Sequence, residues 1–376
     1  MIRSITPPKD PLYVTPKTLL ARLHLDGWLL VGLLTLLSLS VMIIYSASGG
    51  DSDVAQSHLL RILFSFGLLL VFAQIPPSKL FIITPWLFIA GIILLVAVLL
   101  IGDIGKGAQR WLDLGFIRLQ PSEIMKLALP MMVAWLFAYT DFPAPLSRFI
   151  LGTIIIVLTA GLIVVQPDLG TSILIAMSGL FVLFFAGLPW KIILSVLAIF
   201  AVSAPILWTF LHPYQQQRVL TFLNPESDPL GSGYHIIQSK IAIGSGGVDG
   251  KGFLGSTQAH LDFLPESTTD FIFSVFAEEF GLIGVAVLLL VYGFILARGL
   301  YIASQAQDNF TRLIAVSFTL TFFIYLSVNI GMVSGLLPVV GLPLPLISYG
   351  GTSMVTIMIS FGILMSIHTH KKMLST

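Results

Sequence analysis

The sequence has no cysteine among its 376 residues. This absence excludes disulfide bridges, thiolate catalysis and cysteine-ligated metal sites, and it leaves the redox compartment open. Charge is also scarce: Asp, Glu, Lys and Arg make up 10% of the chain, whereas soluble domains carry about 25%. The net charge of +1 gives no basis for a nucleic-acid partner.

The sequence also lacks a recognisable cleavable signal peptide. Residues 1–27 contain four basic residues, Arg3, Lys9, Lys17 and Arg22, but no short separate apolar stretch followed by a small-residue cleavage site. We therefore predict that residues 1–27 form a cytoplasmic tail and that the first membrane helix acts as an uncleaved signal. Internal repeats and low-complexity tracts are absent as well.

Apolar residues fill most of the chain instead, because 56% of it is hydrophobic. A membrane-spanning helix needs about 20 predominantly apolar residues. This criterion predicts an all-α polytopic membrane protein, with a membrane domain at 28–368 and a cytoplasmic tail at 369–376. About ten transmembrane helices are expected, at residues 28–46, 58–74, 81–101, 124–139, 149–165, 171–188, 192–211, 271–297, 313–337 and 351–368.

The basic residues predict the orientation of these helices. An even number of spans places both termini on one side, and the short loops of that side are basic, which makes it cytoplasmic. The loop residues concerned are Lys79, Arg148, Lys191, Arg298 and Arg312. Eight other basic residues fall on or near the outer side together with most of the outer acids, and they call for a functional explanation: Arg61, Lys106, Arg110, Arg118, Lys126, Arg218, Lys240 and Lys251.

Two outer segments, 102–123 and 212–270, are candidates for a functional site. Loops longer than about 12–15 residues are usually functional or disordered, and the aromatic residues of the second segment favour an ordered loop between helices 7 and 8. This large loop ends at Asp270, where a long apolar run begins. Glu278 and Glu279 lie inside that run, and carboxylates in such a place are costly, which indicates a site.

Several segments of the chain have long and unusual sequences. They include Lys106-Gly-Ala-Gln-Arg-Trp-Leu-Asp-Leu-Gly115, Gln120-Pro-Ser-Glu123, Gln166-Pro-Asp-Leu-Gly-Thr-Ser172, Thr269-Asp-Phe-Ile-Phe273 and Pro343-Leu-Pro-Leu-Ile-Ser-Tyr-Gly-Gly351, with others at 228–231, 233–240, 244–247 and 263–266. Together they resemble the signatures of the SEDS family, in family order and from end to end. The resemblance is strongest to the branch of that family that serves cell elongation.

The resemblance implies a peptidoglycan glycosyltransferase that polymerises lipid II for cell elongation and rod shape. The enzyme would lie in the cytoplasmic (inner) membrane with its active site on the outer face. The implied partners are a class B penicillin-binding protein that acts as transpeptidase, other membrane proteins of the elongation complex, lipid II and membrane lipids. Many relatives have His directly before the Thr-Asp pair, whereas this chain has Thr268, so a role of that His does not carry over.

The resemblance also implies that Asp270 is the catalytic residue. A general base takes the proton of the attacking sugar hydroxyl, and the departing lipid pyrophosphate needs cations or a metal. A divalent cation, Mg²⁺ or Mn²⁺, held by Asp270 and pyrophosphate oxygens is therefore expected. Spacing alone favours a helix cap, because Ser267-Thr-Thr-Asp270 fits a capping pattern, and one carboxylate can serve both purposes.

Further candidates divide into substrate contacts and supporting residues. The candidate substrate contacts are Arg110, Trp111, Lys126, Arg218, Lys240 and Lys251. The supporting residues are Glu123, Asp168, Glu278, Glu279 and Ser348.

Structural interpretations of several candidates stay open beside these roles. Trp111 suits an interfacial anchor, and Asp168 suits a turn or cap. Lys126 and its neighbour three residues earlier suit an ion pair. Glu278 and Glu279 suit buried partners of a basic residue elsewhere. The segment 244–247 lacks the lysine spacing of a phosphate-binding loop, and a flexible turn is expected there.

The main alternative function is a lipid II flippase or transporter, with Glu123, Lys126, Glu278 and Glu279 lining a path. Transporters tend to contain internal repeats and to bind at the midplane. The absence of a repeat and the one-sided polar residues favour chemistry at the outer face. A passive scaffold for the transpeptidase is a third possibility, and it would make Asp270 dispensable.

Overall fold

The computed structural model describes residues 19–105, 108–113, 115, 118–140, 144–210, 213–224, 232–261, 263–264 and 266–370. Within these ranges the chain forms fourteen helices and three short strands, beginning with α1 (Leu19–Arg22). The ten longest helices coincide with the ten predicted spans. They are α2 (Gly27–Ala47), α3 (Ser52–Ala73), α4 (Pro77–Ile101), α5 (Pro121–Phe137), α6 (Leu146–Val165), α7 (Leu169–Phe185), α8 (Trp190–Phe210), α12 (Ile272–Ser304), α13 (Asn309–Val333) and α14 (Gly351–Thr369).

Seven of the described helices are long and apolar enough to cross a membrane: α2, α3, α4, α6, α12, α13 and α14. The helical, multi-pass membrane fold is thus confirmed, while the number of ten spans stays a prediction.

The scarce acids of the chain are used where helices begin. Asp26, Asp51, Asp168 and Asp308 are the N-cap residues of α2, α3, α7 and α13, and each side chain accepts a backbone N–H of the first turn. Such a cap satisfies amide groups that a new helix cannot pair internally. The apolar runs therefore set the length of these helices, and the aspartates set where they start.

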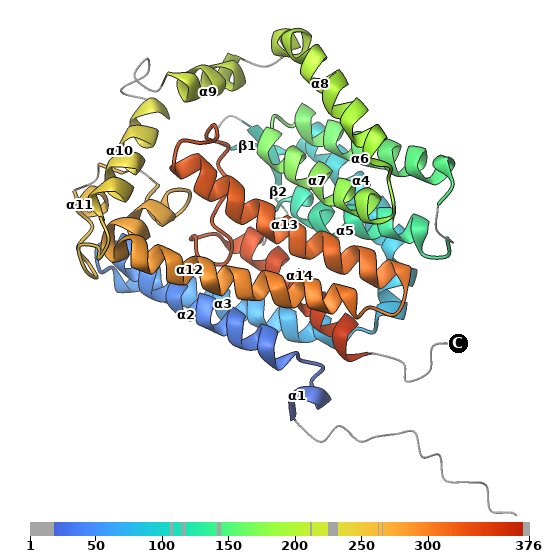
Figure 1. Cartoon of the computed structure of the whole chain (residues 1–376), viewed down its shortest axis with the longest axis horizontal. Helices are drawn as coiled ribbons and strands as arrows, with labels where there is room; N and C mark the ends of the chain where they lie inside the picture. Colours follow the sequence, from blue (N-terminus) through green and yellow to red (C-terminus); the bar gives the residue numbers. More distant parts are fainter. Residues whose placement is uncertain are drawn as a thin grey trace, which may run out of the picture.

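α13 and α14 lie at the centre of the bundle, with 61% and 67% of their apolar windows buried, whereas α3 and α12 reach only 22%. α12 and α2 pack on one side of this centre, α14 packs against α3, and α5 and α7 pack against α13 (Figure 1). Outward-facing side chains of the peripheral helices are large and apolar, for example Leu60 and Phe64 on α3. This distribution suits a helix bundle surrounded by lipid.

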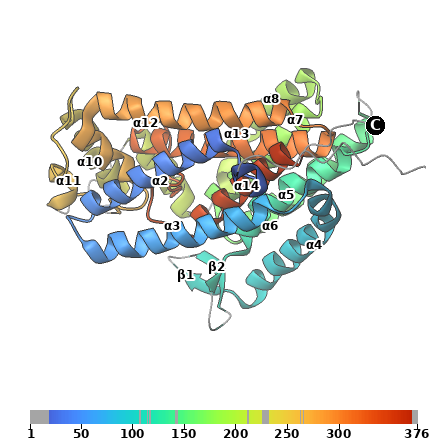
Figure 2. The same cartoon turned by 90° about the horizontal axis from the view of Figure 1, so that it is seen from below.

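The two ends of the bundle differ. We call the end that carries α9 (Pro213–Leu223), α10 (Ser232–Ser245) and α11 (Thr257–His260) the loop end. α1 and the end of α14 lie at the opposite end (Figures 1 and 2). The described part of the large segment before Asp270 thus contains three helices joined by non-helical stretches. Its aromatic content predicted an ordered loop but not these helices.

A small antiparallel sheet follows α4, in a segment that the sequence analysis treated as a loop. Its strands are β1 (Asp103–Gly105), β2 (Ala108–Asp113) and β3 (Arg118–Leu119), in that order across the sheet. β2 packs against α4 and α5. The sheet thus carries Arg110 and Trp111 on a short, braced strand.

At the opposite end, one buried carboxylate joins three helices. Asp26 accepts hydrogen bonds from Arg298 Nε and Nη2 at 2.9 and 2.6 Å, and His368 Nδ1 lies 3.0 Å from Asp26 Oδ2. Burial alone would raise the pKa of Asp26, but the hydrogen bonds from His368 and Arg298 outweigh it and hold the pKa well below its usual range. The start of α2 and the ends of α12 and α14 are thus connected through the Asp26 carboxylate.

Candidate active site

Asp270 lies directly before α12 at the loop end. The N-cap residue of α12 is Phe271, and it makes no side-chain capping hydrogen bond. The helix therefore begins one residue beyond the position that spacing favoured for a cap. The Asp270 side chain is half-buried, and a Cβ placed on Gly341 would lie 3.4 Å from its Oδ2.

The backbone just before Asp270 is fixed by a second segment from far along the chain. Ser348 Oγ donates to the carbonyl oxygen of Thr269 at 2.6 Å, and the backbone N–H of Tyr349 donates to the carbonyl oxygen of Thr268 at 2.9 Å. Ser348 Oγ also accepts the N–H of Leu344 at 2.7 Å. Ser348 thus holds the main chain beside the carboxylate, which suits the predicted supporting role.

Asn329 of α13 holds the same region from the other side. Its Nδ2 donates to the carbonyl oxygens of Asp270 and Leu342, at 2.9 and 2.7 Å. In the non-helical segment 335–350, which follows α13, Leu342 and residues 344–348 are buried in protein. The sequence analysis did not single out Asn329; its only signal is a buried amide in a helix of apolar residues.

α12 is broken nine residues after it begins. Gly281 has φ 60° and ψ −162°, a conformation that residues with a Cβ avoid. Around the break, four backbone hydrogen bonds of 2.9–3.2 Å join α12 to the loop end. Before the break, the carbonyls of Glu278 and Glu279 accept from the N–H groups of Lys251 and Gly252. After it, Leu282 and Ile283 donate to the carbonyls of Gly247 and Val248. The short part of α12 that follows Asp270 is therefore tied to the loop.

The glycine-rich segment near 246–250 makes this close approach possible. A Cβ on Gly246 would lie 2.1 Å from the carbonyl oxygen of Ala277, and one on Gly250 would lie 2.1 Å from that of Glu279. The expectation of a flexible turn at 244–247 does not describe this arrangement. Residues 244 and 245 end α10, and Gly246 is buried against α12.

Glu278 is fully buried and surrounded by donors from the loop. Lys251 Nζ lies 2.5 Å from its Oε1, Ser256 Oγ donates to Oε2 at 2.6 Å, and Thr257 donates through both its Oγ1 and its N–H, at 2.8 and 3.1 Å. A buried carboxylate needs this degree of pairing. The buried-partner interpretation of Glu278 is the one that the geometry supports, and Lys251 is engaged in it rather than free for a substrate.

Glu279 connects the same part of α12 to α2. Ser46 Oγ lies 2.5 Å from Glu279 Oε1 and accepts the N–H of Leu254 at 3.1 Å. His260 Nε2 lies 2.9 Å from the carbonyl oxygen of Ser46. The end of α2, the loop and the start of α12 therefore meet at this carboxylate.

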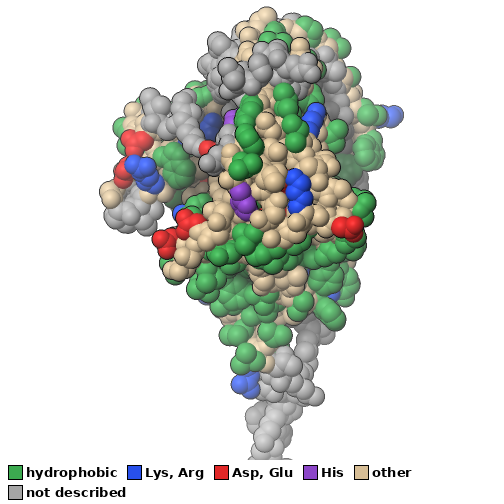
Figure 3. All heavy atoms as spheres, turned by 90° about the vertical axis from the view of Figure 1, so that its left-hand side faces the viewer, with side chains coloured by type: hydrophobic (Ala, Val, Ile, Leu, Met, Phe, Trp, Pro, Cys, Tyr) green, Lys and Arg blue, Asp and Glu red, His purple; other side chains and the backbone are tan. Residues whose placement is uncertain are grey.

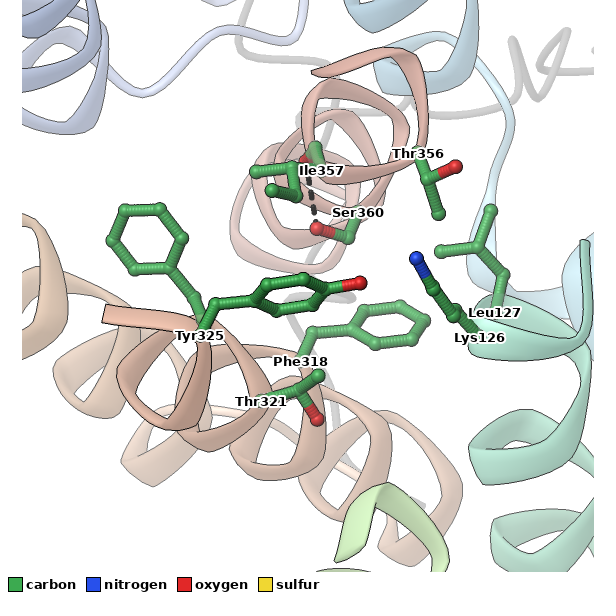
Figure 4. Close-up of a pocket in the computed structure, with 9 residues that line it drawn as sticks. Lys126, Leu127, Phe318, Thr321, Tyr325, Thr356, Ile357 and Ser360 are labelled. Carbon is green, nitrogen blue, oxygen red and sulfur yellow. Dashed lines mark hydrogen bonds between the residues drawn. The ribbon is translucent and has the colours of Figure 1, made fainter. Parts of the chain in front are cut away.

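Glu123 and Lys126 form the predicted ion pair, at 2.7 Å, with both side chains almost buried. Thr356 Oγ1 donates to the second oxygen of Glu123 at 2.8 Å, so that α5 is joined to α14. Lys126 Nζ and the Tyr325 hydroxyl point toward one another across a small cavity (Figure 4). With a volume of about 20 Å³, the cavity has room for one water molecule and not for a sugar.

Arg110 and Asp168 also form a pair. Arg110 Nε lies 3.5 Å from Asp168 Oδ2, and its Nη2 donates to the carbonyl oxygen of Pro167 at 3.0 Å. Asp168 accepts the N–H and the hydroxyl of Thr171 at 3.2 and 2.9 Å, so that its capping role is confirmed. Trp111 is half-buried and lies opposite Asp103 in the β1–β2 register.

Lys240 differs from these cations, because it faces no carboxylate among the described residues. It is exposed on α10, and its stem passes over Gly335, where a Cβ would lie 2.2 Å from Lys240 Cε. Ser239, the residue before it, holds α10 through Ser274 Oγ and the carbonyl of Val333, at 2.6 and 2.5 Å. Arg218 belongs to α9, and its side chain lies outside the described part of the structure.

Charged side chains are few on the face that looks out from the loop end, and on the left of this view basic and acidic side chains touch one another (Figure 3). Within the described residues, no group of three or more His, Cys, Asp or Glu side chains is placed to hold a metal ion.

Comparison with known proteins gives concordant results. The family model for cell cycle proteins of the FtsW, RodA and SpoVE type matches residues 18–373. The peptidoglycan glycosyltransferase MrdB of Escherichia coli (strain K12) is 54% identical over 360 residues, which cover 96% of this chain and 97% of the relative.

Two solved structures have the same architecture. One is a chain from a study of structural coordination of polymerization and crosslinking by a peptidoglycan synthase complex, with a TM-score of 0.80 and 32% identity over 91% of this chain and 97% of that chain. The other is the crystal structure of the rod shape determining protein RodA of Thermus thermophilus, with a TM-score of 0.68 and 27% identity over 92% of this chain and 98% of that chain.

Proposed function

The chain belongs to the FtsW, RodA and SpoVE family of cell cycle proteins and is a membrane-embedded peptidoglycan glycosyltransferase of the elongation type. From this premise we propose how its loop end works. Lipid II is the substrate, and Asp270 is the general base. The observation that carries this assignment is the fixed backbone of residues 268–270. Ser348 and Asn329 hold it from two sides and leave the half-buried carboxylate beside Gly341.

In the proposed reaction, Asp270 takes the proton of the 4-hydroxyl group of an N-acetylglucosamine unit. The hydroxyl oxygen then forms a bond to the anomeric carbon of a second lipid II, and the bond from that carbon to the lipid pyrophosphate breaks. A positioned base of this kind contributes about 10²–10⁴-fold in rate. Lys240 is the predicted cation best placed to stabilise the leaving pyrophosphate, because no carboxylate of the described chain neutralises it.

A divalent cation, Mg²⁺ or Mn²⁺, is part of the proposal. Mg²⁺ is commonly bound by one or two carboxylates together with substrate phosphates. This mode fits a chain that offers Asp270 and, in its described part, no cluster of three metal-ligating side chains. When bound, the cation would neutralise charge on the pyrophosphate; Asp270 is the residue that would hold it.

The loop end is proposed to face the outside of the cytoplasmic membrane, with both termini in the cytoplasm. The helices that begin at the opposite end carry Lys79, Arg148, Lys191 and Arg312 in their first turns, which suits the cytoplasmic side. A class B penicillin-binding protein is the proposed transpeptidase partner, together with other membrane proteins of the elongation complex.

Asp270→Asn tests the catalytic assignment. The variant keeps the size of the side chain but cannot accept the proton, so polymerisation of purified lipid II should fall by at least about 10²-fold. Product length on gels is the measurement, with and without the penicillin-binding partner. Asp249→Asn, an exposed acid of the same loop, serves as the matched control and should polymerise normally. Near-normal glycan synthesis by Asp270→Asn would remove Asp270 from the reaction.

A further inference from the structure

Arg61 is a cation of the loop end that neither the motifs nor the proposed reaction uses. It lies on α3, and its guanidinium carbon is 4.0 Å from the centroid of the Tyr349 ring. The side chain is half-buried, and in the described part of the chain its guanidinium has neither a carboxylate partner nor a hydrogen-bond acceptor. A guanidinium stacked on a ring keeps its N–H groups available in its own plane.

Most other cations of this end are already paired. Arg110, Arg118, Lys126 and Lys251 lie 3.5, 3.5, 2.7 and 2.5 Å from the carboxylates of Asp168, Asp113, Glu123 and Glu278. A cation that faces a carboxylate has little attraction left for an anionic ligand, because the two charges largely cancel. Among the outer cations whose side chains are described, Arg61 and Lys240 are the two that face no carboxylate.

Arg61 is connected to the candidate active site by short contacts. Tyr349, which lies under the guanidinium, donates its backbone N–H to Thr268, two residues before Asp270. A Cβ on Gly351 would lie 3.8 Å from Arg61 Cδ, so that the start of α14 is adjacent as well. Tyr349 thus presents Arg61 beside the main chain that carries the catalytic carboxylate.

We propose that Arg61 is a binding residue for the pyrophosphate group of the lipid-linked substrate. The inference rests on the proposed function and adds a residue to it. Planar guanidinium groups bind phosphate oxygens through two parallel N–H groups. Tyr349 fixes the plane, and the absence of a described carboxylate leaves the charge for the ligand. Phosphate headgroups of the bilayer offer the same chemistry, so the test must separate the two sources.

A binding measurement with inorganic pyrophosphate tests the proposal without turnover. Full-length protein in neutral detergent is titrated with pyrophosphate, and the shift in thermal unfolding temperature reports affinity. Arg61→Gln should bind about 10–100-fold more weakly than wild type, as expected for the loss of a charge-assisted contact. Arg118→Gln, which removes an exposed and already paired cation, is the matched control and should bind like wild type. Equal affinities of the two variants would overturn the proposal.

Two additional arms complete the test. Arg61→Lys keeps the charge without the planar fork and should give an affinity between those of wild type and Arg61→Gln; wild-type affinity in this variant would contradict bidentate binding. In vesicles of phosphatidylcholine alone, Arg61→Gln should raise the KM for lipid II, and adding phosphatidylglycerol should not create the defect. A defect that exists only with phosphatidylglycerol would assign Arg61 to headgroups instead.

The proposed function can fail separately from this inference. Asp270→Asn protein should still bind pyrophosphate, since Arg61 is intact in it. If that variant proves active, the base assignment is lost, while the binding comparison between Arg61→Gln and Arg118→Gln still decides the role of Arg61.

Discussion

At the scale of single residues, the carboxylates of the loop end fall into two kinds. Glu278 is saturated by donors from Lys251, Ser256 and Thr257, and Asp168 by Thr171 and Arg110. The backbone of Asp270 is held by Asn329, and its side chain lies half-buried next to Gly341. A carboxylate whose backbone is fixed by neighbours is well suited to a reaction, because its position is set before the substrate binds.

Glu278→Ala should destabilise the protein strongly. Removing the buried carboxylate leaves the Ser256 hydroxyl and the N–H groups of Thr257 and Gln258 without their acceptor. Each buried group left unsatisfied costs about 1–3 kcal/mol. Thermal and denaturant unfolding of the full chain in mild detergent would measure the change. Asp249→Ala, an exposed acid in the same loop, is the control and should lie within about 0.5 kcal/mol of wild type. A Glu278→Ala protein as stable as this control would show that the buried pair contributes nothing.

At the scale of elements, the long helices were predictable and the breaks were not. Hydropathy runs set helix position, and all ten expected spans correspond to helices, because twenty apolar residues specify a span locally. The β1–β3 sheet and the kink in α12 depend on contacts between segments far apart in the chain. Gly281 looks like any glycine in an apolar helix until residues 248–250 are placed against it.

Gly281→Ala tests the break in α12. A Cβ at this position would lie 2.4 Å from Gly250 N and 2.5 Å from the carbonyl oxygen of Val248, and φ 60° is itself unfavourable for alanine. We expect destabilisation of more than about 2 kcal/mol, measured by unfolding, and loss of polymerisation. Gly293→Ala is the matched control, since nothing lies within 4 Å of its added Cβ. There the substitution should stabilise the helix by about 0.5–1 kcal/mol.

The candidate site was predictable only where its residues lie in recognisable motifs. Asp270, Ser348, Glu123 and Lys126 were proposed from such motifs. The structure shows the Glu123–Lys126 ion pair, whereas the roles of Asp270 and Ser348 in a reaction stay predictions. Arg61 lies in no such motif and was noticed only as one of eight outer basic residues, and Asn329 was not noticed at all. Their contacts with Tyr349 and with the backbone of Asp270 join segments that are far apart in sequence. Periodicity shows which face of a helix is apolar, but it does not show which distant segment meets that face.

At the scale of the whole molecule, the polar groups are divided between the two ends and the middle is largely apolar. The opposite end is closed by Asp26, which joins α2, α12 and α14 through Arg298 and His368. Because the pKa of Asp26 is lowered in the folded protein, the charged form is the stabilising one.

The free energy of unfolding should therefore depend on pH through Asp26. A carboxyl group with a depressed folded pKa contributes fully above its unfolded pKa, near 3.8, and loses the contribution as pH falls below that value. Unfolding of wild type and Asp26→Asn should be compared between pH 7 and pH 3. The wild type should be the more stable protein at pH 7, and the difference should shrink toward pH 3. A difference that is constant over this range would contradict the role of the charge.

The break at Gly281 also affects which residues of the protein move together. Residues 272–280 share main-chain hydrogen bonds with the loop around 247–252, and Glu278 and Glu279 add side-chain bonds to the same loop and to Ser46. Segments that are joined by such hydrogen bonds open together, and they need not coincide with whole helices. Leu282 and Ile283 also donate to the loop, at the carbonyls of Gly247 and Val248, so the loop holds both sides of the break. A force on the loop would therefore reach Asp270 through residues 272–280 and the rest of α12 through residues 282 and 283.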